Sequence, residues 1–480
     1  TSIPELIGDQ KFLFDPHNAK DITSLINKSL TDEEFYQSIC SNSKERSKYF
    51  SWKNTCMKTL EALDNVLTRK SKSSFMQKIK LNQSIGDQYS ILINNLLKSP
   101  FINSRLNFNT KYLRLLASSI ALINNQLKKI EMFRLVKNNE KLTWHIEGPF
   151  DSSYSLAILN RNYALAMDKL GQNVSLFSTE GPGDYEPDSR FLDSNPLVNK
   201  LYQRSIDASG KFFICTRNLY PPRVNDVTGA INILHAYGWE ESSFPAKWVE
   251  DFNSSLNGIT VMSKQVKKIL IDSGVNLPIK VSGLGIDHIE KIKLTEDLIL
   301  KARKFKILHI SSCFPRKGID ILLQAFAEAF TNNDDVSLII KTFDNPHNSI
   351  DSELEKFNKI YPDFPDVVLI KDDLNDSQLK SLYQQSNLLV APSRGEGFGL
   401  PLAEAMLLGI PVVTTNWGGQ LDFCNSSNSW LIDFDFAPST SHFNLDFSYW
   451  AEPIIEDLSN TLQEVYNSSS LEIQKKVDLA

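Results

Sequence analysis

The chain of 480 residues is too long for a single hydrophobic core, so we expect two or three domains. Its composition, 41% hydrophobic and 22% charged, is that of a globular protein, and no apolar run approaches the roughly 20 residues that span a bilayer. A formal net charge of -6 argues against a general nucleic-acid binder, which usually carries a basic face. The five cysteines form no CxxC pair, so the sequence predicts neither a disulfide framework nor a thiolate zinc site and favours the cytoplasm.

The first 140 residues differ in pattern from the rest. Residues 12–15 (Phe-Leu-Phe-Asp) precede a helical stretch, as residues 430–433 (Trp-Leu-Ile-Asp) do near the other end. We therefore interpret residues 1–65 as the tail of a preceding catalytic unit in a longer tandem protein; chance similarity between two αβ edges is the alternative. Residues 66–140 have helical periodicity without strands, which predicts a helical linker or subdomain. The basic run at 69–80 favours a solvated helix face over contact with an anionic membrane.

From residue 141 onward, short apolar strands alternate with amphipathic helices, a pattern typical of parallel sheets with crossover helices. The first unit has strand 142–146, a helix capped at Asp151 or Ser152 and closed by Gly171, and strand 174–177. Together these elements make one βαβ unit.

A second series of strands and helices follows a hinge predicted near residues 284–287. Residues 141–290 and 291–480 thus form two Rossmann-like halves of an α/β fold, with a ligand cleft between the carboxyl ends of both sheets. The elements predicted in the second half are strands 306–310, 336–340, 367–370, 387–391 and 411–415, and helices 319–330, 376–385 and one that opens at Pro401.

The most informative segment is residues 391–406, Ala-Pro-Ser-Arg-Gly-Glu-Gly-Phe-Gly-Leu-Pro-Leu-Ala-Glu-Ala-Met. A strand ends, three glycines let the backbone approach a ligand, and Pro401 suits the first residue of a helix. Free N–H groups at such a helix start suit the pyrophosphate or hydroxyls of a nucleotide sugar. Glu404, expected on the first helical turn, can accept two ribose hydroxyls, and Glu396 can bind sugar hydroxyls. Each alone could be a surface glutamate, but two carboxylates that bracket one Gly-rich turn favour a binding site.

This segment resembles the E-x7-E motif of glycosyltransferase family 4, a group of retaining enzymes with the GT-B fold of two facing Rossmann-like domains. The resemblance extends through 411–415 and 418–422 and covers roughly residues 141–465, and residues 4–52 look like the tail of another such unit. It implies a retaining transfer of a hexose from a nucleotide diphosphate sugar to a saccharide, with same-face attack. The donor-binding residues that it implies are Glu404 for the ribose, and Glu396, Gly397, Phe398, Gly399 and Leu400 for the sugar.

A second patch, residues 311–318 (Ser-Ser-Cys-Phe-Pro-Arg-Lys-Gly), lies between a strand and a helix at the rim of the same cleft. Fixed cations there would stabilise the charge that develops on a leaving diphosphate. In the family an Arg and a Lys about five positions apart do this. Lys317 matches the Lys, whereas Ser312 stands at the usual Arg position. Arg316 then supplies the second cation or Ser312 hydrogen-bonds the diphosphate; an Arg-Lys-Gly that is merely solvated is the alternative.

The N-terminal half is expected to bind the acceptor. In the first βα turn, where the family's glycine loop approaches both substrates, we assign Gly148 to the donor and Tyr154 to the acceptor. Residues 234–242 are expected to form an active-site loop after a strand. There His235 contacts the transferred sugar, as the family's histidine does, or packs in the core. Trp239 stacks on an acceptor ring or is buried.

Neither a DxD pair in a metal-binding context nor a GxGxxG turn is present, so the sequence predicts no metal and no cofactor besides the donor substrate. Residues 147–155 and 312–318 resemble multi-domain bacterial transferases that build lipopolysaccharide O-antigen, often polymannose, from GDP-mannose. This implies a cytoplasmic mannosyltransferase with an oligosaccharide or lipid-linked acceptor, and association with the inner face of the membrane through an assembly partner. The alternatives are a GT-B enzyme that uses a UDP-sugar, such as an epimerase, and a non-catalytic nucleotide-sugar-binding scaffold module.

Overall fold

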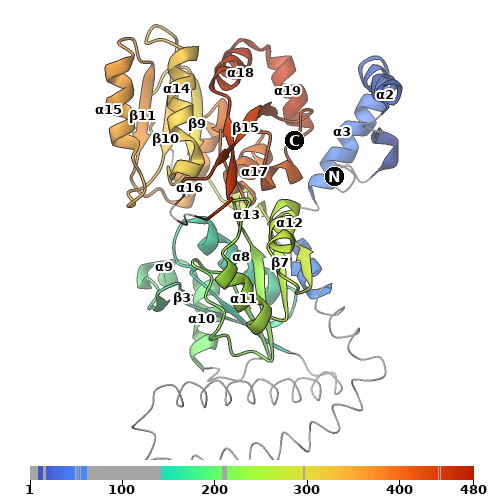
Figure 1. Ribbon diagram of the computed structural model, residues 1–480, viewed down its shortest axis with the longest axis vertical. Helices are drawn as coiled ribbons and strands as arrows, with labels where there is room; N and C mark the ends of the chain where they lie inside the picture. The colour runs from blue at the N-terminus through green and yellow to red at the C-terminus, as the bar shows by residue number, and fades with distance from the viewer. Residues whose placement is uncertain are drawn as a thin grey trace, which may run out of the picture.

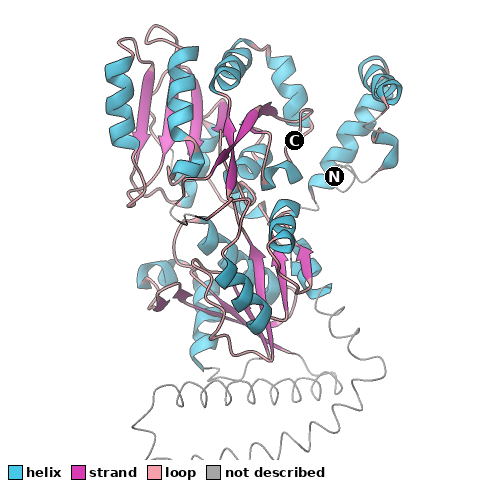
Figure 2. Cartoon of the chain, viewed as in Figure 1, coloured by secondary structure: helices cyan, strands magenta, loops and turns pink. Residues whose placement is uncertain are grey.

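Two parallel sheets dominate the computed structural model, one in each half of the chain (Figure 1, Figure 2). The predicted linker at 66–140, with its basic run, lies outside the described residues. Within the described part of the chain, no helix is both long and apolar enough to cross a membrane. The structure describes residues 9–14, 18–48, 51, 53–54, 56–61, 142–207, 213–295, 298–441, 443 and 445–480.

The N-terminal sheet has six parallel strands in the order β2-β1-β5-β6-β7-β8. The order reverses between β1 and β5, which makes the carboxyl ends of these two strands the switch point at which open α/β sheets bind ligands. The strands are β1 (Thr143–Glu147), β2 (Asn173–Phe177), β5 (Ile214–Arg217), β6 (Ile231–Tyr237), β7 (Gly258–Val261) and β8 (Ile279–Val281), with a small hairpin β3 (Thr179–Glu180) and β4 (Gly183–Asp184).

Amphipathic helices cover both faces of this sheet, because near-continuous apolar strands must be buried on both sides. The helix α8 begins at Ser155, and its N-cap position, Tyr154, makes no side-chain cap. The predicted cap at Asp151 or Ser152 is therefore wrong, and the Asp151 carboxylate accepts from the Tyr185 hydroxyl and the Asp188 N–H instead. The helices are α8 (Ser155–Lys169), α9 (Ser189–Ser194), α10 (Pro196–Asp207), α11 (Ala246–Ser255), α12 (Lys264–Asp272) and α13 (Asp287–Lys291).

The C-terminal sheet has the order β11-β10-β9-β12-β13-β14 and is parallel throughout. This is the doubly wound order in which the first and fourth strands adjoin, so β9 and β12 flank the switch point. The strands are β9 (Phe305–Ile310), β10 (Val336–Lys341), β11 (Asp366–Ile370), β12 (Leu388–Ala391), β13 (Val412–Thr415) and β14 (Trp430–Ile432).

One face of the C-terminal sheet packs on α14, α15 and α18, and the other on α16 and α17, which gives two separate buried clusters. The predicted α/β class with two Rossmann-like halves of the GT-B kind is confirmed. The helix α15 was missed by the sequence analysis. The helices are α14 (Ile319–Ala329), α15 (Ile350–Ile360), α16 (Asp376–Gln384), α17 (Leu400–Leu407), α18 (Ile455–Asn467) and α19 (Ser470–Asp478).

The described N-terminal segments form α2 (Ala19–Thr31) and α3 (Glu33–Ser47), drawn in blue beside α19 in Figure 1. Further along, Cys56 is fully buried in the core of the N-terminal half, where its thiol contacts the carbonyl of Tyr163. The short segment around Cys56 thus contributes to that core, although it is remote in sequence from the first strand.

A long antiparallel hairpin connects the two halves. Its strands, β15 (Phe434–Pro438) and β16 (Tyr449–Pro453), leave the C-terminal half, and its tip packs into the aromatic core of the N-terminal half through Phe443 and Leu445. The sequence analysis did not predict this hairpin.

Candidate active site

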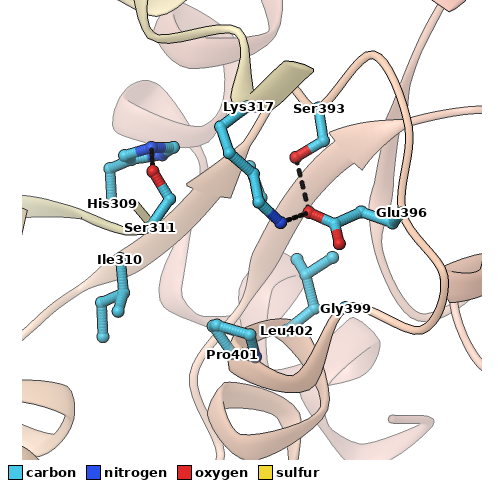
Figure 3. A pocket seen from close by; sticks show the side chains of 10 residues that line it. His309, Ile310, Ser311, Lys317, Ser393, Glu396, Gly399, Pro401 and Leu402 are labelled. Atoms are coloured by element: carbon cyan, nitrogen blue, oxygen red, sulfur yellow. Dashed lines mark hydrogen bonds and ion pairs between the residues drawn. The ribbon is translucent and has the colours of Figure 1, made fainter. Parts of the chain in front are cut away.

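Two loops meet at the switch point of the C-terminal sheet. One follows β9 and contains the short 3-10 helix η3 (Pro315–Lys317); the other follows β12 and leads through the Gly-rich turn into α17. A small pocket lies between them (Figure 3), lined by Lys317 from the first loop, Glu396 from the second and Pro401 at the helix start. The structure therefore brings together the two patches that the sequence analysis assigned to the donor.

Lys317 and Glu396 form the centre of this pocket. Lys317 Nζ donates to Glu396 Oε1 at 2.5 Å, and Ser393 Oγ donates to the same oxygen at 2.8 Å. Glu396 Oε2 accepts no hydrogen bond from the described part of the chain. The two side chains are only 15% and 10% exposed, so the pair is largely withdrawn from solvent. One oxygen of the carboxylate thus holds the lysine, and the other remains for a ligand.

The charges in the pocket influence one another. Burial, and then the neighbouring charge of Arg316, lowers the pKa of Lys317. Burial alone would raise the pKa of Glu396, but the charges of Lys317 and Arg316 outweigh it and hold this pKa below its ordinary value. Glu396 is therefore an ionised acceptor at neutral pH, suited to sugar hydroxyls.

A buried histidine that the sequence analysis missed connects the two strands, β9 and β12, from which these loops start. His309 lies in β9, and its Nδ1 is 2.8 Å from the carbonyl oxygen of Val390, a residue of β12. Its Nε2 is 2.8 Å from Ser311 Oγ, and this oxygen accepts the N–H of Cys313 at 3.0 Å. Burial lowers the pKa of His309 to about 4, with the charge of Lys317 acting in the same direction, so the ring is neutral at pH 7.

The backbones of the two loops are in direct contact at Gly318 and at Arg316. Gly318 has φ of 68°, and a Cβ there would lie 2.1 Å from the carbonyl oxygen of Pro392. The N–H of Arg394 donates to the carbonyl of Arg316 at 2.7 Å. Gly318 is thus needed both for its left-handed backbone and for close approach.

Arg394 anchors the Gly-rich loop rather than facing a ligand. Its guanidinium binds both carboxylate oxygens of Asp320 at 2.8 Å and both of Glu452 at 2.6 Å, and it lies 5.2 Å from the ring centroid of Trp450. Burial would lower the pKa of Arg394, but the two carboxylates raise it above its ordinary value. These bonds tie the start of the Gly-rich loop to α14 and to the hairpin strand β16.

Glu404 lies one helical turn further along than predicted. It is the fifth residue of α17, on its second turn, and is buried. The Nε2 atom of His288 is 2.9 Å from Oε1, and the hydroxyl of Tyr383 donates to Oε2 at 2.7 Å. Each carboxylate oxygen keeps lone pairs after these bonds, since an ionised carboxylate has about four acceptor positions. The two partners fix the orientation of Glu404.

The remaining residues predicted to bind the donor are Phe398, Leu400, Ser312, Gly397 and Gly399. Phe398 and Leu400 are buried in a cluster with Ile158, Leu159 and Ala236 of the N-terminal half, so their side chains form an interdomain contact. Ser312 is partly exposed, and its carbonyl accepts from the Asn345 side chain at 2.9 Å. Gly399 is the N-cap residue of α17 and has a φ of 87°. A Cβ added to Gly397 would lie 3.2 Å from the backbone nitrogen of Trp239.

A loop of the N-terminal half, residues 238–243, closes over the Gly-rich turn. Arg316 pairs with Glu240 at 3.2 Å, and a Cβ on Gly395 would lie 2.4 Å from the Glu240 carbonyl oxygen. The tip of the hairpin holds this loop in place, because Glu241 Oε2 accepts from Ser439 at 2.8 Å and from Ser448 at 2.7 Å. Arg316 therefore faces the opposite half of the molecule, at the rim of the cleft.

His235 and Trp239 occupy core positions. His235 belongs to β6 itself, not to a loop after it, has no exposed surface and stacks on the Tyr163 ring with centroids 4.5 Å apart. Neither ring nitrogen of His235 has a hydrogen-bond partner among the described residues, and burial lowers its pKa to about 3. Trp239 is 2% exposed among Phe244, Trp248 and Phe443, so it presents no ring face to the cleft. For both, the packed alternative describes the structure.

The first βα turn is built for close packing. Gly148 has φ of 154°, and a Cβ there would lie 2.3 Å from both the Asn160 amide nitrogen and the Asn218 carbonyl oxygen. Tyr154 donates its hydroxyl to Glu180, and burial followed by this hydrogen bond raises the pKa of the phenol. This turn follows Glu147, the last residue of β1, and so lies at the switch point of the N-terminal sheet.

An exposed aromatic residue lies close to the buried Trp239. Tyr220, three residues after β5, is 42% exposed and contacts Trp248 and Phe443 edge-on. Burial raises its pKa to about 12, with the charge of Glu240 adding to this and that of Arg316 opposing it. The described residues contain no group of three or more metal-ligating side chains.

Comparison with known proteins finds sequence similarity over most of the chain. Residues 290–437 match the family model described as "Glycosyl transferases group 1". The serotype-specific mannosyltransferase WbdA of Escherichia coli is 24% identical over 449 residues, which cover 86% of this chain and 53% of WbdA. The chain thus spans about half the length of the curated relatives that it matches over most of its own length.

Two further proteins show partial similarity. The capsular polysaccharide biosynthesis glycosyltransferase CapM of Staphylococcus aureus is 30% identical over 175 residues, or 34% of this chain and 44% of CapM. Among solved structures, sucrose-phosphate synthase from Thermosynechococcus elongatus aligns with a TM-score of 0.48 at 15% identity, over 71% of this chain and 92% of that chain.

Proposed function

We propose that this chain, whose residues 290–437 form a glycosyl transferases group 1 domain, moves a hexose from a nucleotide diphosphate sugar onto a saccharide with retention of configuration. The observation that carries the proposal is the buried Lys317–Glu396 pair, which lies under the Gly-rich turn at the switch point of the donor-side sheet. A cation for a leaving diphosphate and an acceptor for sugar hydroxyls are thereby within one small pocket.

In the proposed reaction, the bond between the anomeric carbon and the diphosphate oxygen breaks. The acceptor hydroxyl oxygen forms the new bond on the same face, and its proton passes to the leaving phosphate. Lys317 stabilises the negative charge that develops on the diphosphate, because a fixed cation in a water-poor site needs no reorganisation. Glu396 orients the sugar, Glu404 holds the ribose, and the backbone of the Gly-rich turn approaches the donor.

The finer proposal is that the sugar is mannose, that the donor is GDP-mannose, and that the acceptor is a growing saccharide such as a lipopolysaccharide O-antigen. It is supported by the name of the WbdA relatives, at 24% identity or less, and by the resemblance of residues 147–155 and 312–318. We further propose that the protein works in the cytoplasm on an oligosaccharide or lipid-linked acceptor, with an assembly partner at the membrane.

The test is transfer from GDP-mannose, UDP-glucose, UDP-GlcNAc and UDP-galactose onto short mannose oligosaccharides, followed by mass spectrometry of the products. A product one hexose heavier with GDP-mannose alone supports the full proposal. Transfer from a UDP-sugar keeps the glycosyltransferase assignment and rejects the mannose donor. Nucleotide binding without any transferred sugar rejects the catalytic proposal for this chain.

A further inference from the structure

The polar groups beneath the donor pocket have a defined direction of hydrogen bonding. His309 Nδ1 lies 2.8 Å from the carbonyl oxygen of Val390, and a carbonyl can only accept. The proton of the neutral ring therefore sits on Nδ1, and Nε2 is an acceptor. Among the described residues, the one group at hydrogen-bond distance from Nε2 is Ser311 Oγ, at 2.8 Å, so the serine hydroxyl donates this hydrogen bond to the histidine.

The same serine already accepts one hydrogen bond. The N–H of Cys313 donates to Ser311 Oγ at 3.0 Å and helps hold Cys313 at a φ of 52°, a left-handed conformation that is uncommon for a residue with a side chain. The Cys313 sulfur, at 3.7 Å, is a weaker competitor for the serine proton than the histidine nitrogen. The Ser311 hydroxyl donates its one hydrogen bond to His309 Nε2 and accepts one from Cys313. It can therefore offer a ligand only its remaining acceptor lone pair.

Ser311 lies at the pocket, where this property matters. His309, Ser311, Lys317 and Glu396 all line it, and Figure 3 shows the His309–Ser311 bond on one side and the Lys317–Glu396 bond on the other. Phosphate oxygens are acceptors and cannot pair with an acceptor-only serine. A sugar hydroxyl can donate, and it is the complementary group on a nucleotide sugar.

We propose that Ser311, fixed as an acceptor by His309, accepts a hydrogen bond from one hydroxyl of the transferred sugar, so that it takes part in sugar selection. His309 is the positioning residue, since both of its ring nitrogens are engaged by Val390 and Ser311 and it acts through the serine. Because the histidine also bridges β9 to β12, the serine is held in register with the Gly-rich loop that contains Glu396. This inference rests on the proposed function, because it assigns a subsite of the same donor pocket.

The experiment combines Ser311→Ala with a set of donors that each lack one sugar hydroxyl. With the natural donor, the variant should lose about tenfold in kcat/KM, the range for one hydrogen bond to a neutral group. With one particular deoxy donor, wild type and variant should have equal kcat/KM, because the lost partner is already absent. Deoxy donors at the other positions should keep the tenfold difference between the two proteins.

Two further variants distinguish positioning from simple structural damage. His309→Gln retains a donor for Val390 and an acceptor for Ser311. Its relative kcat/KM values across the deoxy donors should match those of the wild type. His309→Leu removes both hydrogen bonds. Its relative kcat/KM values across the deoxy donors should differ from those of the wild type even where its melting temperature matches that of the Gln variant. Loss of kcat/KM by Ser311→Ala on every donor alike would overturn the proposal.

The outcome for the subsite is separable from that for the function. If the wild-type protein transfers no sugar, binding of the intact donor and its deoxy analogues by calorimetry gives the same cycle without turnover. Equal loss of affinity for all analogues in Ser311→Ala overturns the sugar contact, whatever the reaction. A single analogue that is insensitive to the substitution supports the contact even when transfer fails.

Discussion

Replacing Lys317 by methionine should damage both stability and turnover, and the two effects can be separated. The substitution leaves Glu396 buried at 10% exposure without its ion-pair partner. Breaking a buried pair costs about 3–5 kcal/mol. Here Ser393 still donates to the carboxylate and the charge of Arg316 remains nearby, which favours the lower end of that range. We expect destabilisation of about 3 kcal/mol, or a melting temperature lower by about 6–12 °C.

Turnover should fall for a different reason, because the substitution removes the cation that we propose stabilises the leaving diphosphate. Loss of one preorganised electrostatic contact typically lowers kcat by about 10²–10³-fold. The double variant with Lys317→Met and Glu396→Gln removes the uncompensated charge and should regain most of the stability without regaining turnover. Lys356→Met, at an exposed pair with Glu353, serves as the control and should change neither quantity.

The assays are chemical denaturation and initial rates of sugar transfer for the single, double and control variants. Recovery of turnover together with stability in the double variant would refute the catalytic role of Lys317 and leave a structural one. The pH dependence gives a second check. Because the pKa of Glu396 is depressed in the folded protein, its stabilising contribution is present above its unfolded pKa and is lost as the pH falls through the folded value. The stability gap between wild type and Lys317→Met should therefore narrow on acidification.

Three further predictions concern the surroundings of the pocket. Gly395→Ala should push the Glu240 backbone away and lower kcat/KM by about 100-fold, whereas Gly397→Ala, whose nearest atom is 3.2 Å away, should be milder in the same rate assay; equal effects would contradict this. Glu404→Gln should weaken nucleotide binding by about 10–100-fold in calorimetry through loss of charge-assisted hydrogen bonds, and an unchanged Kd would remove the residue from the ribose site. Tyr220→Leu should raise the acceptor KM several-fold and leave the donor KM unchanged, if the exposed ring contacts the saccharide; a changed donor KM alone would contradict it.

Local sequence patterns were sufficient for the strand–loop–helix units on both sides of the donor pocket. The strand at 305–310, the strand at 388–391 and the helix that starts beside Pro401 follow from apolar runs and from turn chemistry, both of which act within about ten residues. The pairing of Lys317 with Glu396 follows in turn from the doubly wound order, which brings the ends of the first and fourth strands together.

Features that depend on contacts distant in sequence could not be predicted in this way. A histidine inside an apolar strand has the same local pattern whether it is a ligand, a core residue or a bridge, and only Val390 and Ser311 identify His309 as a bridge. The burial of Trp239 depends in part on Phe443 of the hairpin, about 200 residues later, and no local periodicity contains that contact. Whether an aromatic residue in a loop is exposed or buried therefore cannot be predicted from its local sequence alone.

The interactions of the donor pocket divide into two groups by the half from which they come. The Lys317–Glu396 pair, the His309 bridge and the packing of Gly318 on Pro392 all lie within the C-terminal half, so that half alone can preorganise the donor site. By contrast, Glu240 belongs to the N-terminal half and reaches the pocket through Arg316 and the Gly395 backbone. The first group therefore does not depend on the contact between the halves, whereas the second group does. We therefore expect donor binding to depend mainly on the C-terminal half, and the contact between the halves to affect the alignment of donor and acceptor.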